Sequence, residues 1–336
     1  MDSLTHIVLG ACVGEAVAGK QLGKKAMWLG ALANSLPDID FIAGFWMDTD
    51  DELLAHRGFT HSILFAVIAT LFMALAMKRW SHIKKITFKK WEWFFGIEIS
   101  LHLFLDAFNN YGVGWFEPFS PYRISFNTIY VADPFFSVWP AIAFAALLVL
   151  KAHHHKRMWW VKISLCISTV YLIYCCINKI NTDAKLRQAF VAQNIPHEKY
   201  FTTPAPLNNW LWYIVAGNDS GFHVGFHSVF DRKKEVEFHF FPRNDSLLYP
   251  VSDHEDLQHL IRFSQGFYTA EKWNDTLVFN DLRFGQIVGW HNPEEKFVFH
   301  YFLQHPNDNE LVVQRGRFAK WDWETTKSLI KRIRGN

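Results

Sequence analysis

Seven histidines and aspartates in the first 110 residues have the side chains and the spacing of a metal site. They are His6, Asp38, Asp40, His56, His61, His102 and Asp106. His102 and Asp106 are four residues apart, so on a helix they share one face and can reach the same ion. His56 and His61 supply two imidazoles around a Gly turn. We expect all seven to be candidate ligands, because imidazole and carboxylate groups both bind zinc and similar divalent ions.

The size of this set favours a catalytic metal site. Seven potential ligands exceed the four of a closed structural site, so one or two ions with open positions are expected, with zinc favoured and manganese as an alternative. Such ions activate water, which predicts hydrolysis of a phosphoester or another ester. Arg57 lies between two of the histidines, where it either holds an anionic oxygen of the substrate or forms a structural ion pair with a nearby aspartate.

Three alternatives remain open for the same residues. The first is a buried hydrogen-bonded network of histidines and aspartates without a metal. The second is a membrane sensor or scaffold in which the metal is structural. The third is an ion transporter, which needs ionisable groups that continue toward the inner face, and the sequence offers few of these apart from Glu15 and Glu98.

Long apolar runs must position these residues. The clearest are 60–77, 134–150 and 159–177, and each approaches the roughly 20 residues that cross a bilayer. Weaker apolar segments are 3–19, 26–46 and 91–108. The sequence therefore predicts an α-helical membrane bundle of about six segments over residues 1–180, with the candidate ligands inside it.

Basic residues indicate an orientation for this bundle. They concentrate in alternate loops, which by the positive-inside rule are cytoplasmic. These residues are Lys20, Lys24, Lys25, Lys78, Arg79, Lys84, Lys85, Lys89, Lys90, Lys151, Lys156 and Arg157. The pattern predicts an integral membrane protein, with the candidate ligands and residues 181–336 on the outer side.

Residues 181–336 have a different character. Short alternating runs rich in aromatic and β-branched residues predict an α+β domain with an antiparallel sheet. The expected strands are 209–215, 221–230, 235–241, 277–285, 296–303 and 310–314. Helices are expected at 253–264 and 321–333, and nothing in this half predicts a role for it.

Composition agrees with a membrane protein. Half of the residues are hydrophobic and only 20% are charged, which is less than in most soluble domains. The net charge of +2 is too small to favour nucleic acid as a partner. The four cysteines lie in apolar stretches and are interpreted as small apolar side chains. No cleavable signal peptide is expected at the N-terminus.

Four sequence runs carry a resemblance to a known family. DSLTHIVLGA at 2–11, GALANSLPDID at 30–40, HRGFTHS at 56–62 and HLFLDAFNNYG at 102–112 resemble the membrane-bound metal-dependent hydrolases of the YdjM-like family. The resemblance covers about the first 180 residues and implies a protein of a bacterial inner membrane. It implies a metal-dependent hydrolase, and the location in the membrane makes a lipid or another membrane-associated molecule the expected substrate.

The order of the ligands is also distantly similar to that of zinc-dependent phospholipase C and related single-strand nucleases. This likeness implies His6, Asp38, one of His56 and His61, His102 and Asp106 as ligands. It further implies Asp38 or Asp40 as a general base. The chain departs from that pattern because it has no N-terminal Trp and no second HxxxE motif, so a mononuclear or dinuclear site is expected.

Overall fold

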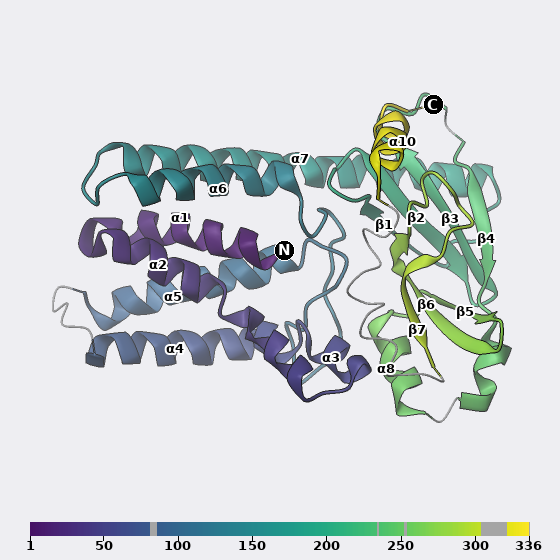
Figure 1. Cartoon of the computed structure of the whole chain (residues 1–336), viewed down its shortest axis with the longest axis horizontal. Helices are drawn as coiled ribbons and strands as arrows, with labels where there is room; N and C mark the ends of the chain where they lie inside the picture. Colours follow the sequence, from purple (N-terminus) through teal and green to yellow (C-terminus); the bar gives the residue numbers. More distant parts are fainter. Residues whose placement is uncertain (81–85, 234, 252–253, 304–320, 336) are drawn as a thin grey trace. The chain divides into compact units, whose positions relative to one another are not determined.

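The computed structural model describes residues 1–80, 86–233, 235–251, 254–303 and 321–335, and its contacts divide the chain into two units (Figure 1). The helical unit comprises Met1–Ala43, Ala55–Cys176 and Pro206–Asn208. The sheet unit comprises Gly44–Leu54, Ile177–Ala205 and Asn209–Asn336. The domain boundary predicted at residue 180 lies inside helix α7, which is continuous from Lys156 to Ala192.

The helical unit is built from apolar helices, and its longest connection, residues 107–133, lies between α5 and α6. Its elements are α1 (Ser3–Leu22), α2 (Lys24–Asn34), η1 (Pro37–Phe45), η2 (Phe59–His61), α4 (Ile63–Trp80), α5 (Phe88–Asp106), α6 (Pro134–Val149) and the first part of α7 (Lys156–Ala192). Side-chain caps fix several helix starts. Asp2 accepts a hydrogen bond from the Thr5 amide at the start of α1, and Asp133 caps α6 in the same way.

Glycines let α1 and α2 approach each other closely. A Cβ atom on Gly10 would lie 2.4 Å from Asn34 Cβ, and a Cβ atom on Gly30 would lie 2.2 Å from the Gly10 carbonyl oxygen. No side chain larger than hydrogen fits there without movement of the backbone. This close contact brings His6 of α1 against Asn34 at the end of α2.

The predicted bundle of six membrane segments is wrong. Among the described residues, α7 is the one helix that is long and apolar enough to cross a membrane. A second span is present only if the bent helix pair Thr49–His61 and Ile63–Arg79 forms a single span. The segment predicted at 26–46 breaks after the 11 residues of α2, which cover only about 16 Å. Helix α6 has 16 residues, or about 24 Å, against the roughly 30 Å of a hydrocarbon core.

The sheet unit contains two antiparallel sheets. The first has the order β1 (Lys199–Pro204), β2 (Leu211–Asn218), β3 (Gly221–Ser228) and β4 (Phe238–Pro242). The second has the order β5 (Tyr268–Trp273), β6 (Thr276–Gln286) and β7 (Phe297–Phe302). The unit also holds α3 (Thr49–Ala55), η3 (Asp245–Val251), α8 (Glu255–Phe263) and α10 (Trp323–Ile333).

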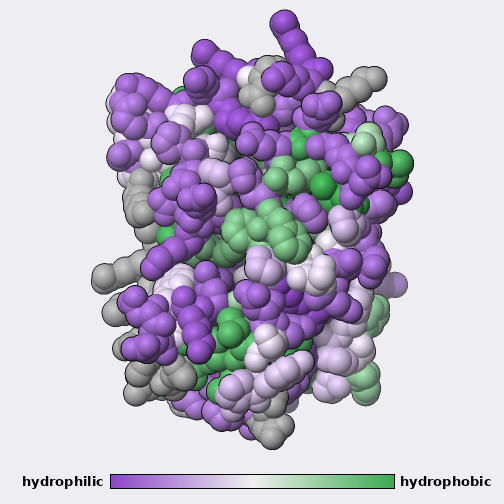
Figure 2. Space-filling model, turned by 90° about the vertical axis from the view of Figure 1, so that its right-hand side faces the viewer, coloured by the Kyte–Doolittle hydropathy of each residue, from purple (hydrophilic) through white to green (hydrophobic). Residues whose placement is uncertain are grey.

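The core of this unit lies on both faces of β2. Phe222 and Val215 pack with Phe201 on one side, while Ile214 packs against Phe190 of α7 on the other. Figure 2, which views the molecule from the side where Figure 1 draws the strands, shows a largely hydrophilic surface. Most apolar side chains of the strands are therefore buried in the core.

The antiparallel prediction for this half is confirmed, although the strands form two sheets and not one. The runs at 209–215, 221–230, 235–241, 277–285 and 296–303 overlap β2, β3, β4, β6 and β7. Strands β1 and β5 were not predicted, and the strand predicted at 310–314 lies outside the described residues.

Candidate metal centre

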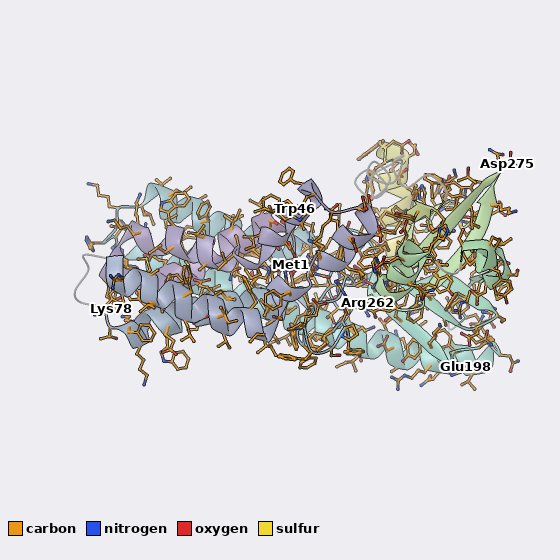
Figure 3. The ribbon with its side chains drawn as sticks, turned by 90° about the horizontal axis from the view of Figure 1, so that it is seen from below. Met1, Trp46, Lys78, Glu198, Arg262 and Asp275 are labelled. Carbon is orange, nitrogen blue, oxygen red and sulfur yellow. The ribbon has the colours of Figure 1, made fainter. Side chains whose placement is uncertain are left out.

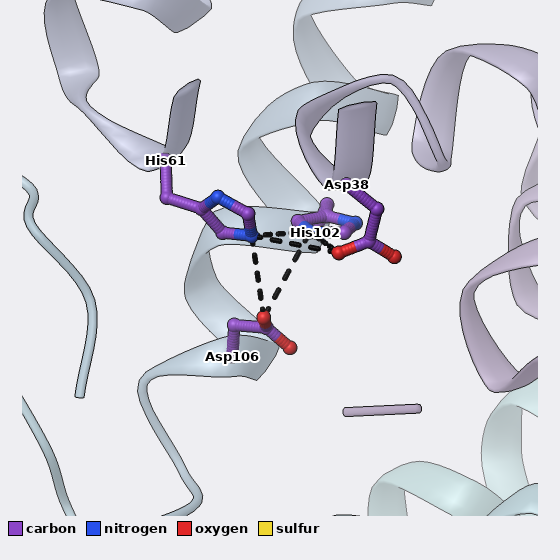
Figure 4. A group of neighbouring side chains, drawn as sticks. All are labelled: Asp38, His61, His102 and Asp106. Atoms are coloured by element: carbon purple, nitrogen blue, oxygen red, sulfur yellow. Dashed lines mark hydrogen bonds and ion pairs between the residues drawn. The ribbon is translucent and has the colours of Figure 1, made fainter. Parts of the chain in front are cut away.

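Four side chains from three parts of the helical unit converge at one point (Figure 4). They are Asp38 at the start of η1, His61 at the end of η2, and His102 and Asp106 in the last turns of α5. Asp38 Oδ1 lies 3.6 Å from His61 Nε2 and 3.5 Å from His102 Nε2. Asp106 Oδ2 lies 3.4 Å and 3.8 Å from the same two nitrogens.

The remaining nitrogen of each imidazole is bound from behind. His102 Nδ1 donates to the carbonyl oxygen of Asn34 at 2.5 Å. His61 Nδ1 lies 3.1 Å from Thr60 Oγ1 and 3.4 Å from Asp40 Oδ2, and either oxygen can accept its proton. A neutral imidazole that carries its proton on Nδ1 presents a lone pair on Nε2, which is the atom that faces the other ligands.

The arrangement fits a divalent cation. The two Nε2 atoms lie only 3.0 Å apart, so their lone pairs face each other and two carboxylate oxygens as well. Four electron-pair donors at such distances repel unless a positive charge lies between them. Five of the six separations lie between 3.0 and 3.8 Å and bracket the edge of about 3.3 Å expected for a tetrahedral zinc site with bonds of roughly 2.0–2.1 Å. The residues therefore suit a zinc-like ion.

Asp106 connects this cluster to two further candidates. Its Oδ2 oxygen lies 3.0 Å from Arg57 Nε, and its Oδ1 oxygen lies 2.9 Å from His6 Nε2 and also contacts the Met1 amine. Arg57 donates in addition to Asn109 Oδ1 and to the Met1 carbonyl oxygen. These contacts agree with the ion-pair alternative for Arg57. His6 contacts Asp106 Oδ1, whereas Asp106 Oδ2 is the oxygen that faces His61 and His102.

Asp40 and His56 lie behind His61 and outside the converging group. Asp40 Oδ2 accepts from the Arg57 amide at 2.7 Å, and Asp40 Oδ1 lies 3.5 Å from His56 Nδ1. Burial opposes ionisation of Asp40, but the hydrogen bond and the charge of His56 outweigh it and lower the pKa of this carboxyl. Asp40 thus orients an imidazole, in the manner of carboxylates that support zinc-binding histidines.

Asn34 is a central residue that the sequence did not single out. Its side-chain oxygen faces His6 Nδ1 at 3.1 Å, its carbonyl oxygen holds His102, and its amide nitrogen donates to Glu98. Glu98 is fully buried, and burial raises its pKa well above the usual range. Only the position of Asn34 inside the run GALANSLPDID could have pointed to it.

The site lies at one end of the helices. His61 precedes α4, whereas Lys78 lies near the other end of that helix, about 25 Å away along its axis. Met1 and Lys78 accordingly lie far apart in Figure 3. The sequence prediction that the ligand clusters share one end, opposite the basic loop that follows α4, agrees with this placement.

A second group with metal-binding side chains lies inside the sheet unit. His259 Nδ1 lies 2.8 Å from Asp50 Oδ2 and 3.2 Å from Asp51 Oδ1. Asp51 is half exposed, and the pairing is also that of an ordinary ion cluster. Sequence analysis did not link these residues, because they are distant in the chain.

Comparison with known proteins adds a family. Residues 1–181 match the family described as YdjM inner membrane protein. The chain is 28% identical to the inner membrane protein YbcI of Escherichia coli over 144 residues, which cover 42% of this chain and 75% of that protein. It is 30% identical over 176 residues to the uncharacterized protein YfhP of Bacillus subtilis, which cover 45% of this chain and 51% of that protein.

The family match concerns mainly the helical unit. The chain spans about half the length of the Bacillus relative. No solved structure matches the chain. The family and the Escherichia coli relative support the predicted membrane localisation in bacteria, and neither description assigns an activity.

Proposed function

The chain belongs to the YdjM family of inner membrane proteins, and we propose that its helical unit is a metal-dependent hydrolase that cleaves an ester or phosphoester of a membrane lipid. One observation carries the proposal: the Nε2 atoms of His61 and His102 face each other at 3.0 Å beside two carboxylates. When bound there, a zinc-like ion supplies a Lewis acid that activates water and polarises the scissile group.

The residues around the cluster have distinct roles in this proposal. In this proposal His61, His102 and Asp106 hold the ion and leave its fourth position to water. Asp38 is the general base, because its side chain is 15% exposed while these three side chains are fully buried. Ser3 Oγ donates to Asp38 Oδ2 at 3.0 Å and fixes the carboxylate so that Oδ1 faces the cluster. The position places a proton acceptor between solvent and the ligands.

Arg57 and Asp40 position the ligands. The guanidinium of Arg57 pairs with Asp106 and holds the orientation of that carboxylate. Asp40 fixes the His61 ring from behind. Both act through another side chain, so removal of either should weaken metal affinity more than it changes the chemistry of a loaded site.

Helix α7 is the proposed membrane anchor. Its length and apolar composition are those of a membrane span. Lys156 is its first residue, and Lys151 lies just before it. By the positive-inside rule that end is cytoplasmic, which places residue 220 in the sheet unit on the outer side. A cysteine introduced at position 220 should react with a membrane-impermeant reagent added to intact cells, and protection there would reject this orientation.

The experiment that tests the activity measures phosphatidylglycerol and phosphatidylethanolamine turnover by the full chain in mixed micelles with added zinc. His102→Gln should abolish turnover, while His153→Gln, which changes an exposed histidine, should not. The proposal would be rejected if His102→Gln turned over lipid as fast as wild type. It would also be rejected if metal-loaded wild type cleaved no ester.

A structural metal site is the second candidate. Full burial of three of the four ligands favours it, because closed structural sites leave no position for water. A folded chain that binds the ion tightly and unfolds when the ion is chelated, but hydrolyses no ester, would support this candidate.

A further inference from the structure

A groove of about 750 Å³ lies between α4 and α5. Its lining is almost entirely apolar and comprises Ile63, Ala66, Val67, Thr70, Leu71, Glu92, Gly96, Ile97, Ser100, Leu101, Leu103, Phe104 and Trp115. All of these residues belong to the helical unit. The volume lies in the range of cavities that bind a small ligand.

Small residues hollow out the groove. Ala66 and Thr70 are one turn apart on α4, and Gly96 and Ser100 are one turn apart on α5. The nearest atom that a Cβ on Gly96 would meet is Thr70 Cγ2 at 3.6 Å, an ordinary contact distance. The space therefore exists because four positions lack large side chains, and a larger side chain at Gly96 would enter it.

One end of the groove adjoins the metal centre. Ile63 lies two residues after His61, and Leu103 directly follows His102. Trp115 lines this end, where its carbonyl oxygen accepts from the Ile63 amide at 2.9 Å and its indole donates to the Leu103 carbonyl oxygen at 3.2 Å. From Ile63 the groove extends to Leu71, about 12 Å along α4.

We propose that this groove binds an acyl chain of the lipid whose head group is presented to the metal centre; this rests on the proposed function. The occupant is apolar, because a peptide backbone placed there would lose its hydrogen bonds to water with few polar groups to replace them.

Access and location agree with a lipid. Val67, Leu71 and Phe104 are each more than 40% exposed, so the groove is open along its side. The chain belongs to a family of inner membrane proteins, so lipid acyl chains are apolar ligands that it meets. The substrate class is thus a lipid that carries at least one unbranched acyl chain beside its ester.

Photocrosslinking tests this binding site directly. The full chain is placed in nanodiscs of phosphatidylethanolamine and phosphatidylglycerol with a phosphatidylglycerol that carries a diazirine in one acyl chain. Crosslinked peptides should concentrate on the groove walls around Val67, Leu71 and Phe104. The double variant Ala66→Leu/Gly96→Leu, which fills the groove, should reduce these crosslinks by about tenfold, equivalent to about 1.4 kcal/mol of binding.

Ile68→Phe is the matched control, because it adds bulk to an exposed position of α4 outside the groove, and it should leave the crosslinks unchanged. Crosslinks spread evenly over the exposed apolar faces of α4, α5 and α6, or unaffected by the filled groove, would overturn the proposal.

Metal content and hydrolysis of bis(p-nitrophenyl) phosphate, measured on the same samples, separate the two proposals. A filled groove that keeps the metal and the hydrolysis of this soluble diester, but loses crosslinks and lipid turnover, supports both. Crosslinks in the groove of a chain that binds no metal would support the acyl site and reject the hydrolase.

Discussion

Replacement of Asp40 by Asn tests whether this residue supports His61 or binds the ion itself. Asp40 Oδ2 lies 3.4 Å from His61 Nδ1 and accepts the Arg57 amide, whereas Asp40 is absent from the group whose ligand atoms converge. An amide keeps the shape of the side chain and can still accept from Arg57. It loses the negative charge that favours a proton on His61 Nδ1.

The expected effect follows from the role of an orienting carboxylate. Loss of such a partner typically weakens metal affinity by about 10- to 100-fold, or about 1.4 to 2.8 kcal/mol. Zinc affinity of the detergent-solubilised full chain, measured by competition with a chromophoric chelator, should fall in this range for Asp40→Asn. The stoichiometry should not change, because all four converging residues remain.

Asp48→Asn is the matched control, since it removes an exposed carboxylate outside the site, and the zinc affinity of this variant should equal that of wild type. An affinity for Asp40→Asn within twofold of the control would refute the orienting role. A complete loss of binding, equal to that of His102→Gln, would instead make Asp40 a ligand.

Two further predictions concern stability. Gly10→Ala forces α1 and α2 apart, because its Cβ would lie 2.4 Å from Asn34 Cβ, so the melting temperature should fall by an amount equivalent to about 1–3 kcal/mol and metal affinity should fall with it. Gly96→Ala is the control, since its Cβ meets nothing closer than 3.6 Å, and equal melting temperatures for the two variants would contradict the close packing of α1 and α2. In the sheet unit, burial opposes ionisation of Asp231, but hydrogen bonds from His227 and Arg332 hold its pKa well below the usual range. Its stabilisation is therefore present above about pH 3.9 and is lost as the pH falls through the lower folded-state pKa, so the stability difference between wild type and Asp231→Asn in urea should shrink below pH 4.

Part of the site could be predicted because it depends on helix periodicity alone. His102 and Asp106 share one face of α5, as four-residue spacing on any helix requires. The different positions of Asp38 and Asp40 could not be predicted. They are two residues apart in a 3-10 segment, and the path of that segment after Pro37 determines which carboxylate faces the cluster.

The role of Asn34 and the lengths of the helices could not be predicted from the sequence either. Asn34 acts through its carbonyl oxygen as much as its side chain, and a backbone contact leaves no residue-type signal. The apolar run at 26–46 was predicted as one membrane segment because hydropathy alone does not show where a helix ends. In the structure α2 ends at Asn34.

The C-terminal half shows the same division. Strands with aromatic and β-branched alternation, such as β3, were found from their pattern. Strand β5, with the sequence YTAEKW, has too little such alternation, and it forms because β6 supplies its hydrogen-bond partners.

Metal content per chain tests the central claim most directly. Elemental analysis of the purified full chain should find roughly one or two divalent ions in wild type and in His56→Gln, because His56 lies outside the converging group. His61→Gln and His102→Gln should each lose the ion while retaining wild-type helical content by circular dichroism. No ion in wild type after reconstitution with excess zinc or manganese, or full retention of the ion in both variants, would contradict the account.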